Sequence, residues 1–132
     1  MAVLVVDADD SHRESLRTLL GEHYELTFVA GLSEALRVVR EHLPDLLVSE
    51  VDLAEGSGLD LCTQVRGLPG GRRLPIMLVT NRSSTADKVA GFQAGADDYV
   101  VKPVDRRLFS ARLRLLHRLK GIERPHDLNT QR

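Results

Sequence analysis

The sequence predicts an α/β fold with a doubly wound, five-stranded parallel sheet. Two observations support this prediction. Five short apolar runs alternate along the chain with segments that carry apolar residues at helical spacing. Most of these runs are continuous and rich in branched residues, as strands buried on both faces should be. The 132 residues are enough for one compact domain, and the order of elements places helices on both faces of the sheet.

The first half of the chain supplies three strands and two helices. Ala2–Val6 reads as a buried strand. A capping box at Ser11–Glu14 opens a helix that ends near Gly21. Apolar and polar residues alternate from Tyr24 to Phe28, which is typical of a strand at a sheet edge. A helix over Leu32–Leu43 stops before Pro44, and the buried strand Leu46–Val48 follows.

The second half continues the alternation. Leu59–Val65 is predicted to be helical, and Ile76–Val79 to be the fourth strand. Ser83 or Ser84 caps a helix that runs through Ala94 to the stop signal Gly95. Tyr99–Val101 is the fifth strand.

An amphipathic helix over Val104–Lys120 completes the predicted domain, which spans residues 1–120. Residues 121–132 contain Pro125 and mixed polar side chains, so we expect a linker or a frayed C-terminal tail there.

Composition excludes several classes of protein. No apolar run approaches the roughly 20 residues needed to cross a bilayer, so we expect no membrane span. The N-terminus lacks a basic region and turns acidic at Asp7, unlike a signal peptide. The single cysteine, Cys62, cannot form an internal disulfide and fits a reducing cytoplasm. It lies among apolar residues and is expected to be a small buried core residue.

Charge is unevenly distributed along the chain. Residues 1–60 contain 13 acidic and 4 basic residues, whereas residues 61–132 contain 6 acidic and 14 basic ones. This difference fits either solvated helix faces or an acidic site followed by a basic partner surface. The basic residues of the last helix are Arg106, Arg107, Arg112, Arg114, Arg118 and Lys120. Nucleic acid is not the expected partner, because the chain as a whole is not basic.

Four polar side chains lie at the carboxyl ends of four of the predicted strands. Asp7 follows the first strand, Glu50 the third and Lys102 the fifth, and Thr80 ends the fourth. Ligands of such sheets bind at the carboxyl ends of the strands, so these side chains should meet. Carboxylates, a lysine and a hydroxyl suit Mg²⁺ and a phosphoryl group. A nucleotide site is not expected, because the chain has no GxxxxGK[ST] or GxGxxG motif.

The chain resembles the receiver domains of bacterial response regulators. The matching stretches are VLVVD at Val3–Asp7, PDLLVSEVDL at Pro44–Leu53, IMLVT at Ile76–Thr80 and AGADDYVVKPVD at Ala94–Asp105. The resemblance covers Val3 to about Lys120 and implies a flavodoxin-like sheet with strand order 2-1-3-4-5. It also implies a place in two-component signalling, where an Asp after the third strand accepts a phosphoryl group from a histidine kinase.

The resemblance also assigns roles by position. Thr80 and Lys102 occupy the positions that contact the phosphoryl oxygens. Phosphorylation pulls the Thr inward and rotates an aromatic residue at the position of Tyr99, so Thr80 and Tyr99 are the expected switch pair. The peptide bond at the position of Lys102-Pro103 is usually cis in the family.

Three departures from the family pattern point to a pseudo-receiver. Glu50 stands at the phosphoacceptor position, and its extra methylene moves the carboxylate about 1.5 Å further into the site. We therefore expect a permanent pair with Lys102 and no catalytic residue. Ala8 replaces a carboxylate that normally binds Mg²⁺, so metal binding by Asp7 should be weak or absent. Asn81 stands where the family favours a small residue.

Asp52 keeps a second interpretation open. It lies two residues after Glu50 and could join Asp7 as a metal ligand, or accept a phosphoryl group in place of Glu50. The alternatives are therefore a Mg²⁺-dependent receiver phosphorylated at Asp52 or Glu50, and a nucleic-acid-binding surface on the last helix.

Our main prediction is a domain that is not an enzyme and signals through protein contacts. The expected partners are a histidine kinase, an output domain or another regulator. The resemblance also implies that a homodimer could form through the fourth helix, the fifth strand and the fifth helix.

Overall fold

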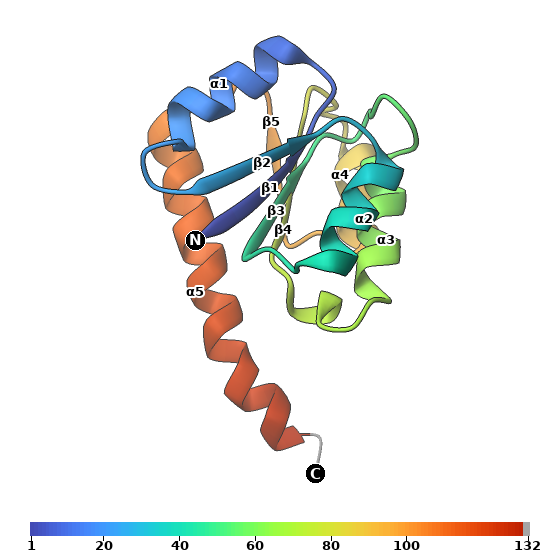
Figure 1. The fold of residues 1–132 in the computed structure, drawn as a ribbon, viewed down its shortest axis with the longest axis vertical. Helices are drawn as coiled ribbons and strands as arrows, with labels where there is room; N and C mark the ends of the chain where they lie inside the picture. The colour runs from blue at the N-terminus through green and yellow to red at the C-terminus, as the bar shows by residue number, and fades with distance from the viewer. Residues whose placement is uncertain (131–132) are drawn as a thin grey trace.

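The computed structural model describes residues 1–130, with side chains described for residues 1–119. Five parallel strands form one sheet in the order β2-β1-β3-β4-β5 (Figure 1), which confirms the predicted fold and strand order. The strands are β1 (Ala2–Val6), β2 (Glu25–Val29), β3 (Leu46–Ser49), β4 (Ile76–Thr80) and β5 (Asp98–Val101). The helices are α1 (Asp10–Leu20), α2 (Leu32–Glu41), α3 (Gly58–Arg66), α4 (Thr85–Ala94) and α5 (Arg106–Thr130), with a short 3₁₀ turn at Gly71–Arg73.

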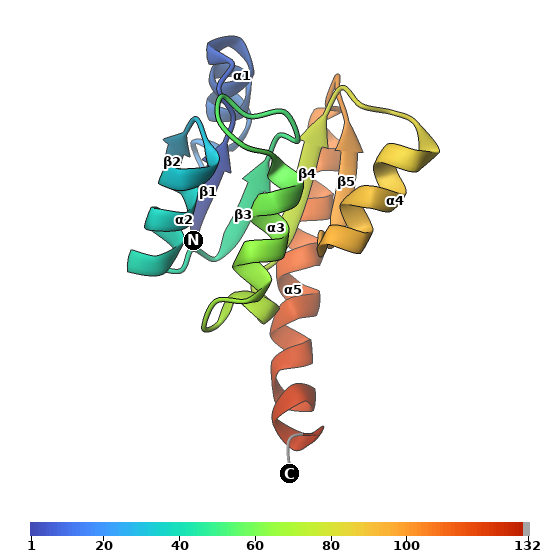
Figure 2. The same cartoon turned by 90° about the vertical axis from the view of Figure 1, so that its right-hand side faces the viewer.

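Helices cover both faces of the sheet, as Figure 2 shows. Because side chains alternate along a strand, Val3 and Val5 of β1 face the layer formed by α1 and α5. Leu4 and Val6 face the opposite layer, to which α2 and α3 contribute. All four of these side chains are at most 1 % exposed. This two-sided burial explains why the strand reads as a continuous apolar run.

The start of α1 differs from the predicted capping box. The helix begins at Asp10, and the N-cap is Asp9, whose carboxylate accepts a hydrogen bond from the His12 N–H at 3.0 Å. Asp9 therefore takes the role expected of Ser11. That hydrogen bond lowers the pKa of Asp9 below its ordinary value. The predicted cap of α4 is confirmed as Ser84, which accepts from the Asp87 N–H.

Two arginine side chains of α1 lie over Phe28 of the edge strand β2. Its alternating pattern leaves Phe28 half-buried on one face. The guanidinium carbons of Arg13 and Arg17, both from α1, lie 5.5 and 4.5 Å from the centre of the Phe28 ring. These contacts fit cation–π interactions and fasten α1 to the edge of the sheet.

Helix α5 continues beyond the predicted limit at Lys120. It runs to Thr130 and extends past the sheet (Figure 1). Residues 121–130, which we expected to form a linker or frayed end, are therefore helical. Adding residues to a helix that is already formed costs little compared with starting one. Residues 131–132 lie outside the described part of the chain.

The core also confirms the expectation for Cys62. Its side chain is fully buried, and burial raises the pKa of the thiol to about 12. Within the described residues, no helix is long and apolar enough to cross a membrane.

Candidate functional site

Four strands bring the predicted side chains to the same edge of the sheet. Val6 of β1 pairs in register with Ser49 of β3, and Thr80 of β4 pairs with Val101 of β5. The residues that end or follow these strands, Asp7, Glu50, Thr80 and Lys102, therefore lie at the same level. Asp7, Glu50 and Thr80 are all less than 9 % exposed.

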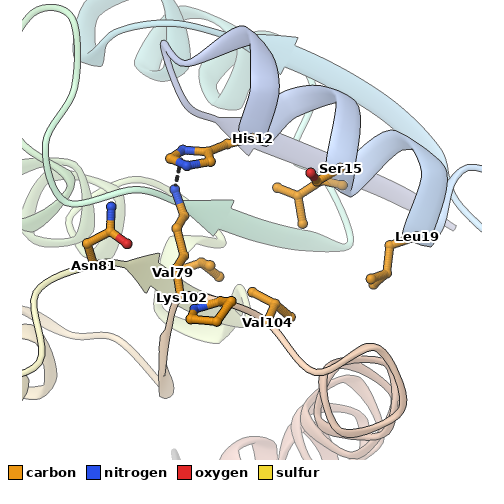
Figure 3. A pocket seen from close by; sticks show the side chains of 9 residues that line it. His12, Ser15, Leu19, Val79, Asn81, Lys102 and Val104 are labelled. Carbon is orange, nitrogen blue, oxygen red and sulfur yellow. Dashed lines mark hydrogen bonds between the residues drawn. The ribbon is translucent and has the colours of Figure 1, made fainter.

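Lys102 is the centre of this cluster. Its Nζ lies 3.2 Å from Oδ2 of Asp7 and 3.5 Å from Oε1 of Glu50. It also lies 2.6 Å from Nδ1 of His12, at the start of α1 (Figure 3). An ammonium group has only donors, so Nδ1 of His12 acts as the acceptor in this contact. The ammonium group of Lys102 thus has three acceptor atoms within 3.5 Å, and its side chain is only 9 % exposed.

Glu50 is held at both ends of its carboxylate. Oε2 accepts a hydrogen bond from the Val51 N–H at 2.6 Å, while Oε1 faces Lys102. The turn that follows depends on Gly58, because a Cβ there would lie 2.2 Å from the Glu50 carbonyl oxygen. The backbone therefore fixes Glu50 at the end of β3, and its side chain points toward the lysine.

The two predicted switch residues, Thr80 and Tyr99, are both inside the protein. Thr80 is fully buried, and its Oγ1 accepts from the Arg82 N–H at 3.3 Å. Tyr99 is 7 % exposed, and its hydroxyl donates to the Arg82 carbonyl at 2.8 Å. Gly91 of α4 leaves room for the ring, since a Cβ there would lie 2.8 Å from Cδ2 of Tyr99. Burial raises the pKa of the Tyr99 phenol.

Asp52 is paired with Arg82 at the rim of the site. Nε and Nη2 of Arg82 lie 2.9 and 2.8 Å from the two Asp52 oxygens, a bidentate arrangement. Arg82 also lies 3.5 Å from Oδ1 of Asp87 on α4. Pairing with Arg82 lowers the pKa of Asp52, and pairing with Asp52 raises that of Arg82. The ion pair joins the loop after β3 to the loop after β4.

A cleft of about 400 Å³ opens beside the cluster (Figure 3). One wall is α1, with His12, Ser15 and Leu19 on the same side of the helix. Val79, Asn81, Lys102 and the segment that follows it contribute the other wall. Asn81 is therefore one of the residues that line this cleft.

The profile of the response regulator receiver domain matches residues 3–114. This chain belongs to that family. It is therefore a receiver domain of two-component signalling. It is 42 % identical over 117 residues to the response regulator MprA of Mycobacterium tuberculosis strain H37Rv, covering 88 % of this chain and 50 % of MprA. It is 36 % identical over 118 residues to the transcriptional regulatory protein AfsQ1 of Streptomyces coelicolor, covering 89 % of this chain and 51 % of AfsQ1. The receiver domain thus spans about half the length of these relatives.

Solved structures agree with the assignment. The receiver domain of a signal transduction histidine kinase from Syntrophus aciditrophicus has a TM-score of 0.82 and 31 % identity, over 93 % of this chain and 92 % of that one. The receiver domain of the sensor histidine kinase PA1611 from Pseudomonas aeruginosa, solved with a coordinated magnesium ion, has a TM-score of 0.79 and 26 % identity. That match covers 91 % of this chain and 97 % of the other.

The residues of this receiver domain do not fit a Mg²⁺ site of the family type. Asp7 faces Lys102 through Oδ2 and accepts the Asp9 N–H through Oδ1. Asp52 is bound by Arg82, and Ala8 has no oxygen in its side chain. Among the described residues, no three His, Cys, Asp or Glu side chains are grouped so that they could hold a metal ion. Mg²⁺ requires several oxygen ligands in octahedral geometry, and these carboxylates are bound to protein donors.

Two site residues were not predicted. His12 was identified only as part of a capping box, although its place in the first turn of the helix after β1 puts it near the strand ends. Arg82 lies two residues after Thr80, just as Asp52 lies two residues after Glu50. This equal spacing after two neighbouring strands was the signal in the sequence that could have paired Arg82 with Asp52. The expected cis bond between Lys102 and Pro103 is confirmed.

Proposed function

We propose that this receiver domain signals through protein contacts without accepting a phosphoryl group. The observation that supports the proposal is the buried carboxylate of Glu50, 3.5 Å from Lys102 at the phosphoacceptor position. It places a permanent negative charge beside the lysine that, in the family, meets the phosphoryl oxygens. Attack on a phosphoryl donor requires in-line geometry, and a displacement of about 1 Å can cost about 100-fold in rate.

The switch positions support the same proposal. Thr80 and Tyr99 are buried and are both bonded to the backbone of Arg82. The bidentate pair between Arg82 and Asp52 holds that loop against the loop after β3. In this proposal, protein contacts maintain one signalling state, the domain is not an enzyme, and Mg²⁺ binds weakly or not at all.

The competing proposal is a receiver that is phosphorylated at Asp52 or Glu50 with Mg²⁺. It is favoured by the presence of Thr80 and Lys102 at their family positions. Asp52 is less suited as an acceptor, because both of its oxygens are bound by a guanidinium group. Binding of nucleic acid by the basic residues of α5 is a third proposal.

The test is incubation with acetyl phosphate, with and without Mg²⁺, followed by intact-mass measurement. We expect no adduct in the wild-type protein or in an Arg82→Ala variant, which frees Asp52. A Mg²⁺-dependent phosphoryl adduct that disappears on Asp52→Asn or Glu50→Gln substitution would overturn the proposal.

A reversion provides the positive control. The double substitution Glu50→Asp and Ala8→Asp restores both family carboxylates, so we expect it to bind Mg²⁺ and to be phosphorylated. Calorimetry measures the first property and intact mass the second.

We also propose that the contacts are made in the cytoplasm by the surface of α4, β5 and α5, with an output domain, a histidine kinase or another regulator. A homodimer through this surface is one form that such a contact can take.

A further inference from the structure

The cleft beside Lys102 has the size and lining of a small-molecule site. Its volume of about 400 Å³ lies in the range of pockets that hold small ligands in proteins. It opens between α1 and the segments that follow β4 and β5. Most of the residues that line it are apolar, namely Leu16, Leu19, Val79, Pro103 and Val104. The polar ones are His12, Ser15, Asn81 and Lys102.

The polar and apolar residues lie toward different ends of the cleft. Figure 3 shows His12, Asn81 and Lys102 toward one end and Leu19 toward the other. His12 and Leu19 are both on α1, and the rise of the helix separates them by about 10 Å. A molecule that fills the cleft therefore needs an apolar body and a polar group at one end.

His12 provides an unused hydrogen-bond donor at the polar end. Its Nδ1 accepts from Nζ of Lys102 at 2.6 Å, so the ring is neutral and carries its proton on Nε2. Within the described part of the chain, this Nε2–H has no acceptor. The His12 side chain is 34 % exposed, which leaves the ring within reach of an incoming acceptor.

Asn81 adds a second polar group without a partner. Its side chain is exposed, and its carboxamide makes no hydrogen bond to any of the described residues. A carboxamide can both donate and accept. His12 and Asn81 thus offer N–H donors from the two walls of the cleft.

The charges at the polar end disfavour a charged occupant. Lys102 lines the cleft, but its ammonium group already faces Asp7, Glu50 and His12. The two carboxylates outnumber the one ammonium, so an anionic group would enter beside an excess of negative charge. A cationic group would instead meet Lys102, and no acidic residue is among the described residues that line the cleft. An uncharged group avoids both repulsions.

We infer that this cleft binds an uncharged small molecule with an apolar body and a carbonyl oxygen at one end. The carbonyl oxygen accepts from Nε2–H of His12 and from the Asn81 amide, while the apolar body packs against Leu19 and Val104. The inference goes beyond the proposed function and does not depend on it, because it concerns the cleft and not phosphorylation of Glu50.

The experiment uses three probes that share one apolar body. They are 2-naphthamide, 2-naphthoate and 2-naphthylmethylammonium, whose head groups are neutral, anionic and cationic at neutral pH. Titration of the whole chain is followed in ¹H–¹⁵N correlation spectra, in which the perturbed backbone amides locate the probe. We expect 2-naphthamide to bind about tenfold or more tightly than either charged probe, with shifts at Ser15, Leu19 and Val104.

Variants test the apolar body and the polar end separately. Ser15→Phe places a ring in the cleft from an exposed helix position and should abolish binding. Thr18→Phe is the matched control, because Thr18 is exposed on the same helix but does not line the cleft. His12→Phe keeps a ring but removes the Nε2–H, and Asn81→Leu removes the carboxamide. Each should weaken binding of 2-naphthamide about three- to tenfold, with the fold checked by circular dichroism.

Four results would overturn the inference. They are tighter binding of either charged probe, binding of 2-naphthamide that Ser15→Phe and Thr18→Phe affect equally, shifts confined to another surface, and no shift with any probe at millimolar concentration. The acetyl phosphate experiment is independent of these readouts. A phosphoryl adduct would reject the proposed function and leave the cleft inference standing, whereas a failure of 2-naphthamide to bind would reject only the cleft inference.

Discussion

Replacing Lys102 with methionine tests the site most directly. The change removes the cation that faces both Asp7 and Glu50 and keeps a side chain of similar length. The Lys102, Asp7 and Glu50 side chains are 9 %, 5 % and 9 % exposed, so water cannot readily replace the lost charge. Removing one partner of a buried ion pair typically costs about 3–5 kcal/mol. We expect a loss of that size from a total stability of about 5–15 kcal/mol for a domain of this kind.

Urea denaturation at neutral pH, followed by far-ultraviolet circular dichroism, measures the loss. Adding Glu50→Gln to Lys102→Met removes one of the two uncompensated charges and should restore about 0.5–3 kcal/mol, as coupled neighbours do. Lys88→Met is the matched control. Lys88 is exposed and has no ion pair within the described residues, so its loss should change stability by no more than about 0.5 kcal/mol.

A clear result would refute the reasoning. If Lys102→Met is destabilised by less than about 1 kcal/mol, and the double variant is no more stable than the single one, the carboxylates do not depend on the lysine. The interpretation of Glu50 as a fixed charge that is permanently paired would then fail.

Three further predictions concern neighbouring groups. Pairing with Arg82 holds the pKa of Asp52 below its ordinary 3.8. The contribution of this ion pair to the stability of the fold is therefore complete above pH 3.8, and it is lost as the pH falls through the pKa of Asp52 in the folded protein. In Arg82→Gln, the Asp52 resonance in an NMR titration should shift its midpoint upward toward 3.8; an unchanged midpoint would contradict the pairing. Tyr99→Phe loses the hydrogen bond to the Arg82 carbonyl and should lower the free energy of unfolding, measured in urea, by about 0.5–1.5 kcal/mol. In the wild-type protein, a Tyr99 phenol that titrates below pH 10 by absorbance would contradict its burial. Gly58→Ala places a Cβ 2.2 Å from the Glu50 carbonyl oxygen and should lower the free energy of unfolding by about 1–3 kcal/mol. The control is Gly67→Ala, whose new Cβ would have its nearest atom at 3.5 Å, so this variant should melt within a few degrees of wild type.

The fold could be predicted from the sequence because its signals are local. Continuous apolar runs such as Ile76–Thr80 identify buried strands, and Ser84 and Gly95 mark the two ends of α4. Parallel strands then bring their carboxyl ends together by topology alone, which is why Asp7, Glu50 and Lys102 could be expected to meet.

The contacts of His12 and Arg82 could not be predicted in the same way. Which side chain reaches Lys102 depends on how α1 packs against the sheet, and no local pattern encodes that placement. The same holds for Asp52, whose sequence position allowed a role in the site. Its partner is Arg82, which only the packing of the loop after β4 brings beside it.

The three acceptors around Lys102 limit what a substitution at Glu50 alone can change. Glu50→Asp alone would shorten one acceptor, but Asp7 and His12 would still hold the lysine, at 3.2 and 2.6 Å. A phosphoryl group arriving at the shortened side chain would have to compete with His12 for the same ammonium protons. Glu50→Asp alone therefore leaves the ammonium group anchored to Asp7 and His12, so the position of the lysine is secured by more than one contact.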